Sequence, residues 1–125
     1  MGIIDALLGN ATEVDLDELD EEFAPILAES ETIQLGYKVV RDLFVFTNRR
    51  LILVDKQGLT AKRVLFRSIP YLSISYFEVE TTGYFELDAE LRIWISGNPD
   101  PIVKDLKNRE NVIAIQKALA GFILG

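Results

Sequence analysis

The sequence has no cysteine and no histidine. Without cysteine, the chain cannot form disulfides, zinc ribbons or thiolate nucleophiles. Without histidine, it lacks the most common general base and transition-metal ligand, which excludes Ser-His-Asp triads and His-ligated zinc. We therefore expect a protein that is not an enzyme, with no catalytic residue, no metal site and no cofactor. An enzyme that uses carboxylates, lysine or tyrosine is the remaining alternative.

The chain also lacks a secretory signal and a long apolar segment. Its N-terminus has no basic region, and the apolar stretch Ile3–Leu8 is short and contains Asp5. No stretch approaches the roughly 18–20 apolar residues that a membrane span needs. We therefore expect a cytoplasmic protein that is not an integral membrane protein. With 125 residues, 49% of them hydrophobic, the chain is long enough for one domain with its own core.

Basic residues are absent from the first 31 positions, which hold ten acidic residues. Residues 32–125 hold ten acidic and thirteen basic residues, a balance of +3. Within them, Arg41–Arg67 contains seven basic residues against Asp42 and Asp55. Two interpretations stay open: a solvated charged surface beside an acidic helix, or contact of the acidic segment with the basic strands within one chain or between chains.

Two short apolar runs predict a β-hairpin at the centre of the chain. Leu43–Phe46 and Leu51–Val54 flank the polar tetrad Thr47-Asn48-Arg49-Arg50. A two-residue turn at Asn48-Arg49 sets Phe46 opposite Leu51 and Val45 opposite Ile52.

Both faces of this hairpin are apolar. Leu43, Val45, Ile52 and Val54 share one face, and Phe44, Phe46, Leu51 and Leu53 share the other. An antiparallel hairpin usually needs only one apolar face, because water covers the other. We therefore predict that a second copy of the chain covers one face. The predicted oligomer interface consists of Phe44, Phe46, Leu51 and Leu53, and the opposite face of the hairpin is the alternative.

Helices are predicted at both ends of the chain. The first is predicted over residues 13–24. It begins at the capping sequence Thr12-Glu13-Val14-Asp15 and ends before Pro25. The C-terminal helix begins near Asn108 or Asn111. Its apolar side chains recur at the spacing of one buried face: Val112, Ile115, Leu119 and Phe122.

Between the helices, alternating patterns and turn residues predict about seven antiparallel strands. Their ranges are Ile33–Val40, Leu43–Phe46, Leu51–Val54, Ala61–Ser68, Tyr71–Glu80, Tyr84–Leu87 and Ala89–Ser96. This order is typical of a small, strongly bent sheet or barrel with a helix closing one end.

Three sequence blocks within this order carry a resemblance to a known family. The blocks are Thr47-Asn48-Arg49-Arg50-Leu51-Ile52-Leu53-Val54-Asp55, Ser68-Ile69-Pro70-Tyr71 and Ser96-Gly97. From about Glu31 to Leu119, the chain resembles the bacterial pleckstrin-homology (PH) domain family. The resemblance implies a mainly β, PH-like barrel of two bent sheets over residues 31–125, capped by the C-terminal helix. Residues 1–30 then form an acidic helical extension. It also implies a homo-oligomer, in the form of a ring.

The basic strands suggest a second kind of binding. An anion or an acidic partner is predicted to bind Arg41, Arg49, Arg50, Lys62, Arg63 and Arg67. Adjacent Arg49 and Arg50 can clamp a carboxylate or phosphate. The competing interpretation is a polar turn in which one arginine pairs with Asp55 or the acidic helix. The net charge of −7 argues against nucleic acid as a partner.

From these patterns we predict a non-enzymatic module that self-associates, with an unidentified protein as a further possible partner. The alternative is a module that binds anionic lipid headgroups or an acidic peptide. A strip of aromatic side chains is predicted on the outward sheet face: Tyr71, Phe77, Tyr84 and Trp94.

Overall fold

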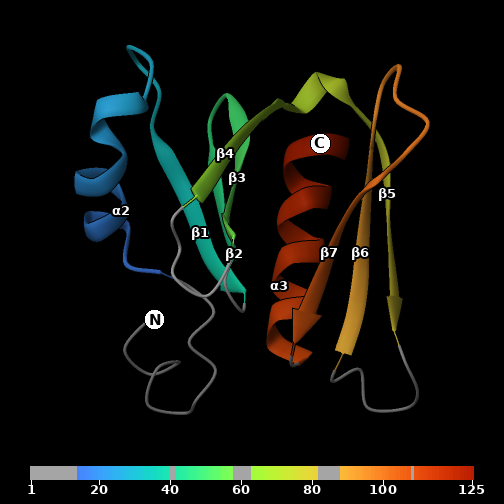
Figure 1. Cartoon of the computed structure of the whole chain (residues 1–125). Helices are drawn as coiled ribbons and strands as arrows, with labels where there is room; N and C mark the ends of the chain where they lie inside the picture. The colour runs from blue at the N-terminus through green and yellow to red at the C-terminus, as the bar shows by residue number, and fades with distance from the viewer. Residues whose placement is uncertain (1–13, 40–41, 58–62, 82–87, 108) are drawn as a thin grey trace. The chain divides into compact units, whose positions relative to one another are not determined.

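Seven strands and two α-helices make up most of the residues that the computed structural model describes (Figure 1). These residues are 14–39, 42–57, 63–81, 88–107 and 109–125. The chain divides into two compact units, Met1–Ile69 and Pro70–Gly125. The predicted strand Tyr84–Leu87, the caps Thr12 and Asn108, and the basic residues Arg41 and Lys62 lie outside the described residues.

The first unit is a helix on a four-stranded sheet of order β1-β2-β3-β4. Its elements are α2 (Leu16–Phe23), the 3₁₀ turn η1 (Ala24–Ile26), β1 (Ile33–Val39), β2 (Asp42–Thr47), β3 (Arg50–Gln57) and β4 (Arg63–Pro70). The predicted hairpin is confirmed, with Phe46 opposite Leu51 and Val45 opposite Ile52.

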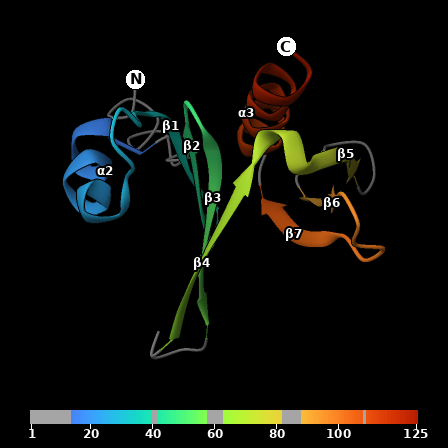
Figure 2. The same ribbon diagram turned by 90° about the horizontal axis from the view of Figure 1, so that it is seen from above.

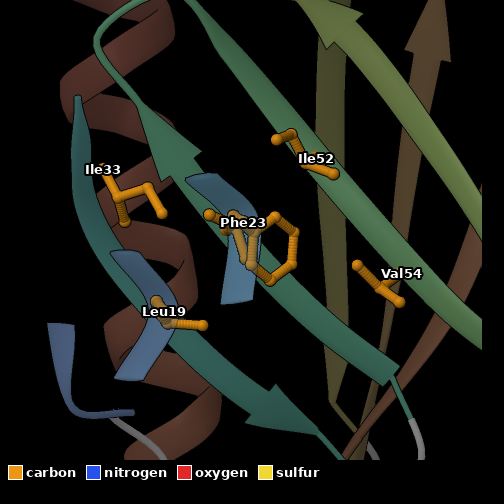
Figure 3. Close-up of a cluster of buried hydrophobic side chains, with 6 residues drawn as sticks. Leu19, Phe23, Ile33, Ile52 and Val54 are labelled. Atoms are coloured by element: carbon orange, nitrogen blue, oxygen red, sulfur yellow. The ribbon is translucent and has the colours of Figure 1, made fainter. Parts of the chain in front are cut away.

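Helix α2 covers one face of this sheet (Figure 3). The Asp15 carboxylate caps the helix by accepting a hydrogen bond from the Asp17 N–H at 2.9 Å. Pro25 follows the helix and lies in η1. The buried core of the unit joins the two helix side chains to the sheet: Leu19, Phe23, Ile33, Val45, Ile52 and Val54. The acidic segment therefore contributes core residues as well as surface charge.

The opposite face of the hairpin is also buried. Phe44, Phe46 and Leu51 are 0% exposed and Leu53 is 2% exposed within a single chain. The Tyr37 ring packs edge-on against Phe46 at a centroid distance of 6.2 Å. Burial of these four side chains argues against a second copy as their cover, and the oligomer interface stays a prediction. The apolar pattern correctly indicated that both faces of the hairpin are buried.

The second unit is a three-stranded sheet, β5-β6-β7, with α3 over one face (Figure 2). Its elements are the 3₁₀ turn η2 (Tyr71–Ser73), β5 (Ile74–Thr81), β6 (Asp88–Ile95), β7 (Ile102–Lys107), α3 (Arg109–Leu119) and the π-helical turn η3 (Ala120–Leu124). The predicted stripe on α3 is confirmed by the burial of Val112, Ile115 and Leu119. Asn111 lies inside the helix, where its Nδ2 donates to the Lys107 carbonyl at 3.0 Å, and is therefore not the cap.

Two strand predictions differ from the structure. β7 was not predicted, because its inward-facing positions include Lys104, which breaks the apolar alternation between Ile102 and Leu106. The predicted strand Tyr71–Glu80 begins only at Ile74, because Tyr71–Ser73 forms the η2 turn. Leu72 in that turn is almost fully exposed instead of lying on a strand face with Ile74.

Candidate functional site

A buried carboxylate joins the helix segment of the first unit to its sheet. Glu31 lies just before β1, and its side chain is 1% exposed. Arg50, at the start of β3, donates from Nε to Glu31 Oε2 at 2.8 Å and from Nη2 to Oε1 at 3.0 Å. The two bonds form the bidentate geometry that a guanidinium favours.

The same guanidinium reaches two further elements. Arg50 Nη2 donates to the Ile26 carbonyl at 2.8 Å, and Nη1 donates to Ser68 Oγ at 2.7 Å. Arg50 thus connects η1, the approach to β1, and β4. We call Glu31, Arg50 and the Thr47 side chain the clip.

The hairpin turn orders the clip from the other side. Thr47 Oγ1 donates to Glu31 Oε2 at 2.7 Å and accepts from the Arg50 N–H at 2.9 Å. Asn48 Oδ1 accepts from the Thr32 N–H at 2.8 Å, and Asn48 Nδ2 donates to the Ser30 carbonyl at 3.2 Å. The Thr-Asn-Arg-Arg tetrad therefore fastens the turn to residues 30–32.

The charge of Glu31 is strongly favoured in the folded protein. Burial alone would raise the pKa of its carboxyl. Hydrogen bonds from Arg50, the Ala28 N–H and Thr47, together with the Arg50 charge, lower the pKa by more than burial raises it. The net result is a pKa of about 2, against an ordinary value of 4.5. Glu31 and Arg50 in the clip are thus both ionised at neutral pH.

This geometry leaves fewer of the predicted residues available to bind an anion. Of the six predicted residues, Arg50 is bound to Glu31, while Arg41 and Lys62 lie outside the described residues. Arg49 and Arg63 are exposed and Arg67 is half-buried. The alternative of a polar turn with one paired arginine describes Arg50 correctly, although its partner is Glu31 instead of Asp55 or helix α2. Sequence reasoning missed Glu31, because no periodicity distinguishes it from nine other acidic residues in the first 31 positions.

Strand β4 is one edge of the first sheet and exposes apolar side chains on both of its faces. Val64, Leu65 and Phe66 are 41%, 38% and 50% exposed. Phe66 also packs edge-on against Phe23 at a centroid distance of 6.1 Å, on the side of α2. At the other edge of the sheet, β1 is mostly buried. The two edges of one sheet thus differ in what they offer to a partner.

A second arginine–carboxylate cluster lies on the outward face of β5-β6-β7. Arg92 on β6 bonds Glu78 at 3.2 Å and Glu80 at 3.1 Å, both on β5, and also Glu90 on its own strand. These hydrogen bonds raise the pKa of Arg92, so it is a permanent cation. The side chains of the three glutamates are 45–68% exposed.

The structure does not bring the described members of the predicted aromatic strip together. Trp94 stacks on Tyr76 at a centroid distance of 4.4 Å, with 11° between the planes. Tyr71 instead stacks on Phe122 at 5.0 Å, Phe77 is half-buried, and Tyr84 lies outside the described residues. The register shift between Ile74 and Tyr76 moves Tyr76 opposite Trp94, which alternation along the predicted strand could not show.

The remaining chemistry is limited. In the part of the chain that the structure describes, no three Asp, Glu, Cys or His side chains are grouped to hold a metal ion. None of the described helices has the length and apolar character needed to cross a membrane.

Comparison with known proteins identifies the family. The family model described as "Bacterial PH domain" matches residues 2–123. The chain belongs to the bacterial PH domain family. The match extends beyond the 31–119 region of the sequence resemblance and includes the acidic helix. The division of the chain at residue 30 stays a prediction.

Several relatives of this PH domain have known sequences or structures. The uncharacterized Bacillus subtilis protein YjqA is 56% identical over 121 residues, which cover 96% of this chain and 97% of YjqA. The crystal structure of a pleckstrin homology domain from Shewanella amazonensis is 57% identical, with a TM-score of 0.87 over 99% of this chain and 100% of that one. A DUF1696 family protein with a pleckstrin-homology domain from Shewanella loihica is 55% identical, with a TM-score of 0.77 over 90% and 96% of the two chains. The PH fold is thus shown, and the family description names a domain type without naming a reaction.

Proposed function

We propose that this PH domain is a non-enzymatic interaction module that self-associates through strand β4 into a closed homo-oligomer. The observation that supports the proposal most directly is the exposed apolar edge of the first sheet. An edge strand presents unpaired backbone donors and acceptors, so it is a template for pairing with another chain. Apolar side chains on both faces add burial to that pairing.

The two edges of the sheet support this choice. Soluble proteins commonly protect an edge by covering it or by placing charges along it. β1 is mostly buried, whereas β4 exposes Val64, Leu65 and Phe66 in succession. Arg63 and Arg67 flank this apolar run and orient a partner through their charges more than they strengthen its binding. The interface predicted from the sequence thus moves from the buried hairpin to β4.

The test is the mass of the purified full chain, measured by light scattering on a sizing column at low and high salt. We expect a discrete oligomer that persists in high salt, because apolar burial is not screened. Leu65→Glu should dissociate it without changing the circular dichroism spectrum. The matched control is Ile113→Glu on α3, since Ile113 is 42% exposed and Leu65 is 38% exposed.

Two results contradict the proposal. One is a monomer at all concentrations; the other is equal dissociation by Ile113→Glu. If the monomer also sediments with vesicles of anionic lipid at low salt, the alternative of headgroup binding through Arg49, Arg63 and Arg67 replaces self-association.

A further inference from the structure

The outward face of β5-β6-β7 combines carboxylates with aromatic rings. Strand register places on one face the side chains Tyr76, Glu78, Glu80, Asp88, Glu90, Arg92, Trp94, Val103, Asp105 and Lys107. We call this set the acidic–aromatic face. It holds five carboxylates and two cations, and it includes the stacked Tyr76–Trp94 pair.

The carboxylates of this face are arranged to hold a guanidinium. Glu78 and Glu80 approach Arg92 from β5, and Glu90 approaches it from β6. One cation is thus shared by three carboxylates, so the cluster keeps a net negative charge. Because Glu78 is 50% exposed and Glu80 is 68% exposed, their remaining acceptor positions face solvent.

The aromatic pair adds a second means of recognising a cation. Tyr76 and Trp94 stack at a centroid distance of 4.4 Å. On this face of the sheet, the next cross-strand pair is Glu78 with Arg92. A guanidinium or ammonium over the face of an exposed aromatic ring is attracted by the negative face of the ring. Carboxylates and rings together favour a basic ligand over a neutral one.

The edge position of β5 determines the shape of that ligand. Among the strands that the structure describes, β5 pairs with β6 alone, so its other side is an edge of the sheet. An extended peptide can add to such an edge through main-chain hydrogen bonds. Side chains two apart in the peptide then lie on one face, roughly 7 Å apart, which matches the spacing of Glu78 and Glu80.

From these observations we propose that the acidic–aromatic face binds an extended basic segment of another protein, with arginine or lysine at alternate positions. The segment pairs with the β5 edge, and its basic side chains contact Glu78, Glu80 and the ring of Tyr76. The chain's net charge of −7 attracts such a partner over longer range. The proposal does not depend on self-association through β4.

The test is a binding titration with the full-length protein. The probe is a short fluorescein-labelled peptide in which arginine and threonine alternate, and its fluorescence anisotropy is measured at low and at physiological salt. We expect saturable binding at both salt concentrations, and none by the peptide with glutamate in place of arginine. The double variant Glu78→Gln/Glu80→Gln should weaken binding about tenfold. Tyr76→Leu should weaken it about threefold.

A matched variant separates this site from general attraction to an acidic protein. Glu21→Gln/Glu22→Gln removes the same charge from exposed positions on α2 and should leave the affinity nearly unchanged. Equal weakening by the two double variants overturns the proposal. It is also overturned if a peptide of residues 63–70 from this chain binds more tightly than the arginine–threonine probe, because a second copy is then the occupant.

Discussion

The two units of this PH domain each carry one arginine bound to carboxylates, and the two arginine side chains are equally exposed, at 22%. The difference lies in their partners. Glu31 is 1% exposed, whereas the carboxylates around Arg92 are 45–68% exposed. A buried carboxylate cannot exchange its cation for water, so Arg50 is needed to keep the fold. Exposed carboxylates can exchange partners at little cost, so Arg92 marks a surface.

The largest expected effect comes from removing the cation of the buried pair. Arg50→Met leaves the Glu31 carboxylate buried without its partner and should lower the free energy of unfolding by about 3–5 kcal/mol. Urea unfolding followed by circular dichroism measures this. Arg49→Met, one residue away at an exposed position, is the control and should remain within about 0.5 kcal/mol of wild type. A loss below about 1 kcal/mol for Arg50→Met would remove the distinction between the two clusters.

Acid should reduce the contribution of the clip to the free energy of unfolding. The folded pKa of Glu31 is about 2, below its ordinary value of 4.5, so its contribution is complete above pH 4.5. That contribution declines as the pH falls from 4.5 toward 2 and amounts to about 3 kcal/mol. The measurement is the difference in unfolding free energy between wild type and Glu31→Gln, which should narrow from pH 7 to pH 3. A constant difference over that range contradicts the assignment.

A pair of double-mutant cycles sharpens the comparison. In the clip, Glu31→Gln and Arg50→Met should be coupled by about 1–3 kcal/mol, because the second substitution removes a charge that the first left unpaired. The coupling free energy between Glu90→Gln and Arg92→Met should be much smaller, because water screens this surface pair. Similar coupling in the two cycles would show that carboxylate burial does not control the strength of the pair.

The smallest expected effect is that of Arg92→Met. Its loss of unfolding free energy should be much smaller than that of Arg50→Met at low salt and should shrink further in about 1 M salt. The loss for Arg50→Met should change little with salt, since that pair is shielded from ions. Urea titrations of both variants at the two salt concentrations measure this contrast.

Local patterns predicted the elements whose inward positions are uniformly apolar. The hairpin was predicted residue by residue, because its period of two and its polar tetrad allow one register. The stripe of α3 was predicted for the same kind of reason. β7 was missed because Lys104 occupies an inward position, and the start of β5 was misplaced because η2 resembles a strand in its sequence.

The candidate site was less accessible to prediction. The basic region was identified, but the binding of Arg50 to Glu31 spans 19 positions and leaves no local pattern. Likewise, the sequence indicated that both hairpin faces are buried, but it could not show which segments cover them.

The sequence by itself thus determined the two helices, most strands, the hairpin register and the family, because these follow from periodicity, turn residues and contiguous motifs. Only the tertiary structure decided which carboxylate is buried with Arg50, which sheet edge exposes apolar side chains, and which rings stack. These features depend on contacts between residues far apart in the chain, where burial changes the value of each charge and each apolar group.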